Sequence, residues 1–185
     1  MPDSSKNEPV PQAELKARAL ELSHVPAASV KGRDTGLLII KLGHGWYGIP
    51  APLALEIIVA PQLAPLPLTP AFVAGIMNVH GELVGAIDLA ALLGLPRPEG
   101  GAADAVVVRR GEMTVALLAE LVSDVEWFAS EDLEPVLPTL PEEYAHLFAG
   151  AFRSGDRLIT EFSIDGILGH PRLQGLRGDL REDKA

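Results

Sequence analysis

Cysteine is absent from this chain of 185 residues, which excludes a disulfide framework and any zinc site built on thiolates. This absence is compatible with a reducing cytoplasm. Aromatic residues are also scarce, at 5% of the chain, although 48% of its residues are hydrophobic. A chain of this length and composition can bury a core, either as one domain or as two small domains that share one.

Basic residues are too few to balance the acidic ones. The 15 lysine and arginine residues stand against 25 aspartate and glutamate residues, so the formal net charge is −10. A charge of this sign repels phosphate backbones and anionic lipid surfaces, so nucleic acid is not expected as a partner. No apolar run resembles a signal peptide, and the run around Ile57 is broken by Glu56 and nearby prolines. We expect a soluble cytoplasmic protein without direct membrane insertion.

Constellations of catalytic or metal-binding residues are not found either. The histidines have no metal-ligand spacing, and no serine occupies a nucleophile elbow. Three glycines in residues 43–48 satisfy the dinucleotide pattern G-x-G-x-x-G, which requires a helix next and an acidic residue about 20 positions on. Instead, Pro50 and Pro52 follow at once, and residues 60–70 hold no carboxylate. We therefore expect no enzyme activity, no cofactor and no metal, and we assign every histidine to a turn or to the surface. The histidines are His24, His44, His80, His146 and His170.

Residues 66–94 give the strongest local signal in the chain. The runs at residues 76–79 and 82–89 are rich in strand-forming residues, and only His80 and Gly81 separate them. A two-residue type I′ turn needs positive φ at both central positions, which glycine adopts freely and histidine more readily than most residues. This stretch therefore predicts a β-hairpin.

A short helix is expected directly after this hairpin. Residues 89–93 are good helix formers, Asp88 stands before them, and Gly94 follows where a left-handed cap is common. We interpret Asp88 as the N-cap residue of this helix rather than as a catalytic carboxylate.

A second hairpin is predicted nearer the N-terminus. Residues 37–42 form an aliphatic run, residues 43–45 a turn, and residues 46–49 a returning strand.

Trp127 and Phe128 are expected to be partly exposed. The other large aromatic side chains are expected to fill the core, and these are Trp46, Tyr47, Phe72 and Phe162.

The chain contains an internal repeat. An offset of 68 residues places LLIIKLG, residues 37–43, over AVVVRRG, residues 105–111. An offset of 75 residues places residues 72–94 over residues 147–169. The second half therefore holds seven extra residues, 75 minus 68, between residues 125 and 147, where several prolines indicate an extended connection.

This repeat predicts a mainly β fold with short helices. Repeat 1 spans about residues 37–94 and repeat 2 about residues 105–169, and residues 95–104 join them. Two sets of short strands favour two small β-barrels or sheets related by an approximate two-fold axis, with about 60 residues in each barrel. No long periodic helix separates the strands, so an α/β fold is not expected.

Both ends of the chain lie outside the repeat. Residues 1–34 are expected to form an extension in which Leu15, Ala19 and Leu22 share one stripe of a short amphipathic helix, residues 12–22. A helix this short is marginal without a partner surface, so it either docks on its own domain, frays in solution, or serves as a docking peptide for another protein. Residues 171–185 are charged and interrupted by glycine, which predicts a flexible tail.

The hairpin region carries a spaced pattern of proline, glycine, asparagine and aspartate. From residue 66 it reads LP-x-TP-x-F-x-x-G-x-x-N-x-x-G-x-x-V-x-x-x-DL, and WYGI and LEII precede it at residues 46–49 and 55–58. Together these segments resemble the CheW family of chemotaxis coupling proteins, over residues 35–170. The resemblance implies two SH3-like five-stranded β-barrels packed around a shared core, in agreement with the internal repeat.

The resemblance also implies a function. A CheW-like protein would be a non-catalytic adaptor that couples methyl-accepting chemoreceptors to a CheA-type histidine kinase. It would be a monomer alone and would join membrane-bound receptor arrays through its partners. The receptor tip would bind in a groove between the barrels, and the regulatory domain of the kinase would bind at one barrel end. The matching contact positions are Ala54, Glu56, Gly75, Asn78, His80 and Leu83.

Individual roles follow from these matches. Gly75 would allow close backbone approach, and Asn78 would hold the turn through a hydrogen bond. If the site of Gly75 is a groove wall, Gly75→Arg is expected to fold and to block the receptor. The family turn reads N-L-R-G, whereas this chain has His80 in place of the arginine. In the family that arginine pairs with the glutamate matching Glu56. Because histidine lacks a permanent forked charge, we expect a weaker kinase contact that depends on pH.

Two other functions fit the same residues. A CheW-like scaffold in a different kinase pathway, such as surface motility or gene control, would share every position named above. A small-molecule-binding β-barrel is the more distant alternative, and a ligand that raised the melting temperature of the pure protein would favour it.

Overall fold

The computed structural model describes residues 32–96, 104–136, 141–170 and 173. Within them, ten strands form two five-stranded sheets. The strands are β1 (Thr35–Leu42), β2 (Gly45–Pro50), β3 (Ala54–Val59), β4 (Val73–Val79), β5 (Glu82–Asp88), β6 (Asp104–Arg110), β7 (Met113–Ala119), β8 (Leu121–Phe128), β9 (Phe148–Ser154) and β10 (Arg157–Phe162). Sheet 1 has the order β8-β1-β2-β10-β9, and sheet 2 has the order β3-β6-β7-β5-β4. The predicted mainly β fold with two five-stranded units is confirmed.

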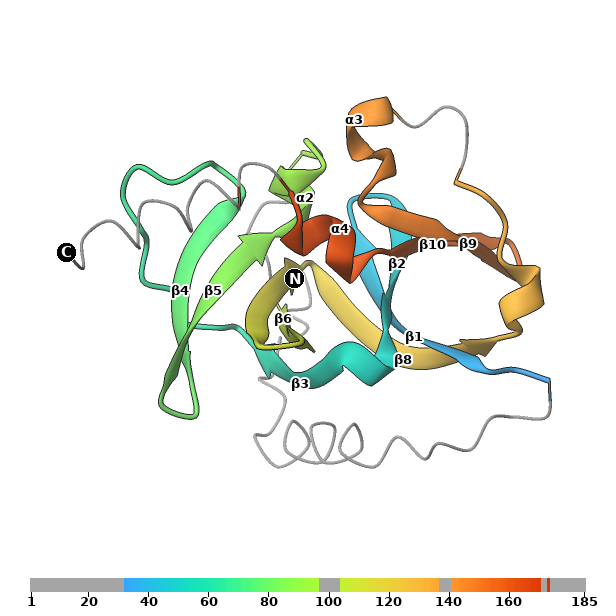
Figure 1. The fold of residues 1–185 in the computed structure, drawn as a ribbon, viewed down its shortest axis with the longest axis horizontal. Helices are drawn as coiled ribbons and strands as arrows, with labels where there is room; N and C mark the ends of the chain where they lie inside the picture. Colours follow the sequence, from blue (N-terminus) through green and yellow to red (C-terminus); the bar gives the residue numbers. More distant parts are fainter. Residues whose placement is uncertain (1–31, 97–103, 137–140, 171–172, 174–185) are drawn as a thin grey trace, which may run out of the picture.

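Helices are short throughout the described residues. They are α2 (Leu89–Leu92), α3 (Glu142–Ala145) and α4 (Ile164–Leu168), with the 3-10 turns η1 (Ala51–Leu53) and η2 (Ser130–Asp132). α2 and α4 lie between the two sheets, whereas α3 stands above β9 and β10 (Figure 1). None of these helices is long and apolar enough to cross a membrane. The expected helix at residues 12–22 lies outside the described residues, as does nearly all of the expected tail.

Each repeat contains five strands followed by a short helix. β4 and β9 lie 75 positions apart, and so do the starts of α2 and α4. At the start of each helix a side chain accepts a backbone hydrogen bond, Asp88 from Ala91 at 2.9 Å and Ser163 from Gly166 at 3.1 Å. The predicted N-cap role of Asp88 is confirmed, and Gly94 adopts the expected left-handed conformation with φ of +65°.

Each sheet draws strands from both repeats. Sheet 1 joins β1 and β2 of the first repeat to β8, β9 and β10 of the second, and sheet 2 joins β3, β4 and β5 to β6 and β7. The parallel pairings β2–β10 and β5–β7 connect the halves. The two repeats therefore do not form one barrel each. The similarity between the repeats shows which strands are equivalent, but it does not show which strands pair.

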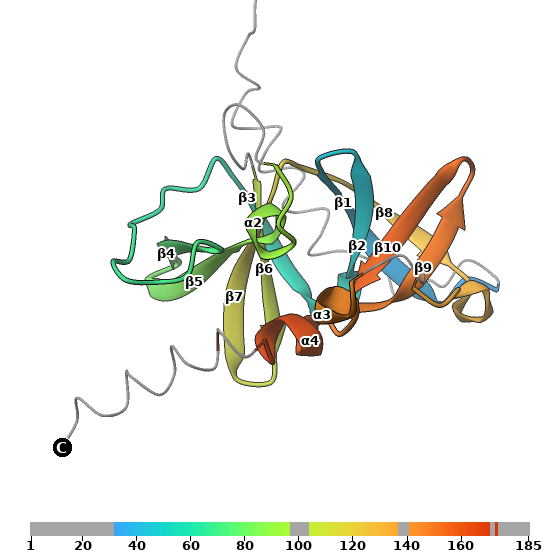
Figure 2. The same ribbon diagram turned by 90° about the horizontal axis from the view of Figure 1, so that it is seen from above.

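Although each sheet contains strands of both repeats, the path of the chain through the two sheets is simple. Sheet 2 is one continuous stretch from β3 to β7, residues 54–119, and sheet 1 contains the strands before and after it. The chain crosses from sheet 1 to sheet 2 at η1 and returns at Glu120. Figure 2 shows the two sheets side by side, with α4 close to the boundary between them.

A shared hydrophobic core holds the two sheets together. It includes buried side chains from β1, β5, β6, β7 and β10, and from α2 and α4. Phe72 and Phe162 are buried in it as expected, whereas Trp46 and Tyr47 are only half-buried. Of the pair expected to be partly exposed, Trp127 is half-buried and Phe128 is buried. Two smaller buried clusters lie apart from this core, one made by strands of sheet 2 and one by strands of sheet 1.

The seven extra residues of the second repeat divide into two groups. An isolated bridge joins Ala64 to Ile76, and the equivalent bridge joins Glu134 to Ala151. Ala64 and Glu134 lie 70 positions apart, so two extra residues precede Glu134 and five follow it. The five lie where α3 forms, a helix that the sequence did not predict.

Candidate functional site

The β4–β5 turn has the predicted geometry. His80 and Gly81 have φ of +50° and +92°, the positive values that a type I′ turn requires. The side-chain oxygen of Asn78 accepts a hydrogen bond from the backbone nitrogen of Gly81 at 2.8 Å. The expected role of Asn78 in holding the turn is confirmed, and the turn presents His80 in a fixed direction.

His80 bridges the two edges of sheet 2. β3 and β4 are the outermost strands of that sheet, yet His80 Nε2 lies 2.9 Å from Glu56 Oε2 on β3. The sheet therefore curls until its edges approach each other, as in an open SH3-like barrel. The expected position of Glu56 opposite His80 is confirmed. The side chain of His80 is 82% exposed and that of Glu56 24%, so the pair lies at the surface and is open to a partner.

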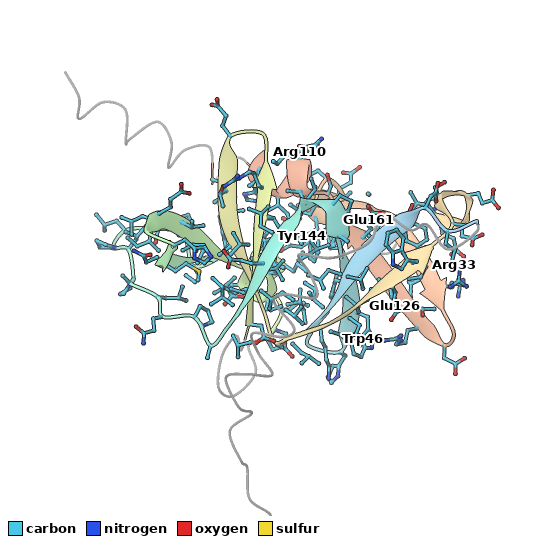
Figure 3. The ribbon with its side chains drawn as sticks, turned by 90° about the horizontal axis from the view of Figure 1, so that it is seen from below. Arg33, Trp46, Arg110, Glu126, Tyr144 and Glu161 are labelled. Carbon is cyan, nitrogen blue, oxygen red and sulfur yellow. The ribbon has the colours of Figure 1, made fainter. Side chains whose placement is uncertain are left out.

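Sheet 1 has an equivalent contact made by other residues. On its edge strand β8, Glu126 accepts hydrogen bonds from Ser154 Oγ and Arg157 Nη2, both at 2.6 Å and both beside the β9–β10 turn. The guanidinium of Arg157 also lies 5.0 Å from the centre of the Trp46 ring. Figure 3 shows Glu126 and Trp46 at the same end of the molecule. In each sheet, a glutamate on one edge strand thus reaches the hairpin turn of the opposite edge.

Leu83 is the largest apolar feature beside the His80–Glu56 pair. It is directly opposite Asn78 in the hairpin and is 72% exposed. Asn78 and Leu83 also line a shallow hollow of about 440 Å³ that reaches Ile58 on β3. We call Glu56, Asn78, His80 and Leu83 the contact surface. It combines an exposed leucine, an ion-pairing group and amide hydrogen-bonding capacity on a rigid hairpin.

Gly75 does not belong to the contact surface. It is buried at φ of +141°, and a Cβ there would collide with the backbone carbonyl oxygen of Ala64. The close backbone approach expected at Gly75 does occur, but the approaching segment is Ala64 of the same chain, which pairs with Ile76. Gly75 is therefore not on a groove wall, which was the condition for Gly75→Arg to fold, because the bridge leaves no room for a side chain.

Ala54 lies apart from the contact surface. It is the first residue of β3, just after the chain has crossed from sheet 1, and it packs partly against the shared core. The structure thus brings together four of the six expected positions and places Ala54 at the junction of the sheets.

Two exposed apolar residues on β3 were not predicted. Leu55 is 44% exposed and Val59 is 47% exposed. Alternation along the strand could have revealed these two exposed residues, because Leu55 and Val59 are four positions apart and therefore share one face of β3. The three consecutive apolar residues 57–59 concealed that signal, since such a run also fits a strand buried on both faces.

The other described histidines lie in turns or near the surface, with one unexpected pairing. The rings of His146 and His170 stack with centroids 5.6 Å apart, although 24 residues separate them, and His170 also meets the edge of Phe72. Within the described residues, no group of three or more histidine and acidic residues is arranged to hold a metal ion.

The curled sheets, their exchanged strands and the surface hairpin define a two-sheet β protein of the SH3-like type. A model of the CheW-like domain matches residues 36–172, which is most of the chain. The chain belongs to the CheW-like family.

Relatives with assigned names agree with this membership. The chemotaxis protein CheW of Klebsiella aerogenes is 30% identical over 137 residues, which cover 71% of this chain and 80% of that protein. The chemotaxis protein CheW of Helicobacter pylori is 28% identical over 129 residues, covering 69% and 77%. The crystal structure of the scaffolding protein TtCheW from Thermoanaerobacter tengcongensis superposes with a TM-score of 0.63 at 21% identity, covering 70% of this chain and 89% of that one. This last similarity shows the fold alone.

Proposed function

We propose that this protein is a non-catalytic adaptor that couples methyl-accepting chemoreceptors to a CheA-type histidine kinase. The observation that carries the proposal is the contact surface, which exposes Leu83 beside the His80–Glu56 pair on a hairpin fixed by Asn78. An exposed apolar side chain next to a charged, hydrogen-bonding pair is typical of a protein contact. Membership of the CheW-like family supports this choice of partners.

The contact surface is assigned to the regulatory domain of the kinase. The edge strands of sheet 2 meet there, and the exposed Leu83 supplies an apolar side chain beside the His80–Glu56 pair. The receptor tip is assigned to the junction of the sheets, where Ala54 begins β3. Two separate surfaces allow one adaptor to hold both partners at once. In this proposal the protein acts in the cytoplasm and reaches membrane-bound arrays through those partners.

Binding of the purified protein to a kinase regulatory domain and to a receptor-tip peptide, measured separately by titration calorimetry, tests the proposal. Leu83→Ser is expected to weaken kinase-domain binding by about tenfold or more, because it removes the exposed apolar contact. Receptor-peptide binding should be unchanged. Leu68→Ser is the matched control, since Leu68 is fully exposed and lies outside the contact surface.

Three results would contradict the proposal. Failure of the wild-type protein to bind either partner would reject the adaptor function. Equal losses with Leu83→Ser and Leu68→Ser would remove Leu83 from the kinase contact. A loss of receptor binding with Leu83→Ser would show that the two partners are assigned to the wrong surfaces.

A further inference from the structure

A cavity of about 290 Å³ lies over sheet 1 and shares no residue with the contact surface. Strands β2, β9 and β10 supply part of its lining, α3 supplies another part, and the segment that follows α2 completes it. Figure 1 shows α3 above β9 and β10. The residues that matter for the argument are Tyr47, Leu93, Leu95, Tyr144, Phe148 and Thr160.

The lining of this cavity is apolar and aromatic, with a few hydroxyl groups. No charged side chain is among the described residues that line it. Tyr47, Tyr144 and Phe148 contribute aromatic rings, and Tyr47 is itself stacked on Phe148 with centroids 6.1 Å apart. A wall of this kind favours aromatic ligands, because offset or edge contacts between rings add to the burial of apolar area. The absence of a charge on the lining disfavours ions, which would lose hydration without a partner.

Three hydroxyl groups at the cavity have hydrogen-bonding capacity to spare. They belong to Tyr47, Tyr144 and Thr160, and none of them makes a hydrogen bond to another described residue. Burial raises the pKa of Tyr47 above its usual value, so this phenol stays neutral. A small number of unpaired polar groups in an apolar cavity is the usual composition of a site for a small molecule, because those groups fix the orientation of the ligand.

The volume limits the size of the occupant. An apolar cavity of about 150 Å³ accommodates benzene, and this one is close to twice as large. It opens to solvent on one side, and one substituted ring fits within it. We propose that the cavity binds an uncharged, single-ring aromatic molecule that carries one hydroxyl or carbonyl group.

Such a ligand would contact both repeats. Leu93 and Leu95 follow α2 in the first repeat, Phe148 and Thr160 belong to the second, and Tyr144 lies on α3 among the extra residues. Binding therefore stabilises the arrangement of the halves, and the melting temperature rises with ligand concentration. The proposal is independent of the adaptor function, because the cavity and the contact surface share no residue.

Methyl NMR with benzyl alcohol as the probe tests the proposal on the full chain. Benzyl alcohol should shift the methyl signals of Leu93, Leu95 and Ala151 to saturation, with a dissociation constant on the order of 0.1–1 mM. Benzoate and protonated benzylamine have the same ring but carry a charge, and both should bind at least about fivefold more weakly. The proposal is overturned if no cavity methyl shifts, if the three probes bind equally, or if exposed leucines such as Leu68 shift as much as the cavity methyls.

Two substitutions remove hydroxyl groups and keep the shape of the cavity. Thr160→Val and Tyr144→Phe should each weaken benzyl alcohol binding by about threefold to tenfold, and kinase-domain binding should not change. Thr114→Val is the matched control, because Thr114 lies on β7 outside the cavity. Wild-type affinity in both cavity variants would overturn the proposed recognition of a polar group.

A further measurement excludes occupation by the chain itself. In the protein without ligand, nuclear Overhauser effects from the methyl groups of Leu93 and Leu95 should reach only the residues of the cavity lining. Effects to any other segment of the chain would show that the protein fills this space, and would overturn the proposal.

Discussion

His80 and Glu56 are 24 positions apart in the chain but 2.9 Å apart in space, where the two edges of sheet 2 meet. The contact joins the Glu56 carboxylate to a ring nitrogen of an imidazole, which lacks the permanent forked charge of an arginine side chain. Since His80 is largely exposed, the pair contributes about 0–1 kcal/mol. The equivalent contact in sheet 1 uses the permanent charge of Arg157.

His80→Arg is expected to strengthen binding to a kinase regulatory domain by up to about fivefold. An arginine keeps its charge and can present two donors to the Glu56 carboxylate, which is the physical reason for the gain. Titration calorimetry of the two proteins measures this. His44→Arg is the control, because His44 lies in the turn between β1 and β2. Identical affinities for His80→Arg and the unchanged protein would leave His80 as a turn residue only.

Gly75→Ala should lower the free energy of unfolding by at least about 2 kcal/mol. Its φ of +141° is unfavourable for any other residue, and the new methyl group would meet the carbonyl oxygen of Ala64. Gly85→Ala on the neighbouring strand is the matched control. A Cβ at Gly85 has no neighbour within 4 Å, so this variant should stay within about 0.5 kcal/mol of the unchanged protein. Urea unfolding compares the two, and equal effects would contradict the explanation.

Asp88→Ala should destabilise the protein by about 1 kcal/mol, because α2 loses its N-cap acceptor. Asp88→Ser should cost much less, since Ser163 already caps α4 at the matching position of the second repeat. Thermal unfolding of both variants gives the comparison. If serine at position 88 were as damaging as alanine, Asp88 would act through a different contact.

Residues 35–95 expressed alone should be unfolded. This fragment contains β1 to β5 but lacks the neighbours β6, β7, β8 and β10, so neither sheet is complete and the shared core is exposed. Mixing it with residues 104–173 should restore dispersed amide NMR signals, because each sheet then has its missing strands. Dispersed signals from residues 35–95 alone would contradict the need for the second repeat.

Glu161→Gln should stabilise the protein at neutral pH. Glu161 is half-buried on β10 between Gly48 and Gly150, and burial raises the pKa of its carboxyl group. The folded state therefore holds the proton more tightly than the unfolded state. Stability falls as pH rises from the unfolded pKa, about 4.3, through the higher folded pKa, and then stays lower.

Urea unfolding at pH 4 and at pH 7 checks this sign. The gain from Glu161→Gln should be small at pH 4 and larger at pH 7. Glu131→Gln, at an exposed site on η2, should show no such change. A loss of stability at both pH values would mean that the Glu161 carboxylate has a favourable partner.

Features that depend on a few adjacent residues could be predicted from the sequence. The β4–β5 turn requires positive φ at two positions, and His80 and Gly81 supply it. The caps at Asp88 and Gly94 follow from residue types that suit helix ends. In each case the residue itself carries the conformational preference, so no knowledge of distant neighbours was needed.

Pairing between distant strands could not be predicted in the same way. An apolar strand such as β2 fits beside many neighbours, and its parallel pairing with β10 depends on the whole arrangement. The pattern indicated that Gly75 needs backbone freedom, but not that Ala64 is the segment that approaches it. α3 has only four residues, which is too few to show a helical period.

The continuous path of sheet 2 has a consequence for the exchange of genetic material. Residues 54–119 enter from sheet 1 at η1 and leave at Glu120, so only two junctions separate this segment from the remainder of the fold. An exchange with one crossover at each junction would transfer the whole sheet as a cassette. Glu56, His80 and Leu83 would travel with it, and so would Leu93 and Leu95, which line part of the cavity over sheet 1. The contact surface would therefore be inherited as one unit, whereas the cavity lining would be divided between the two sources.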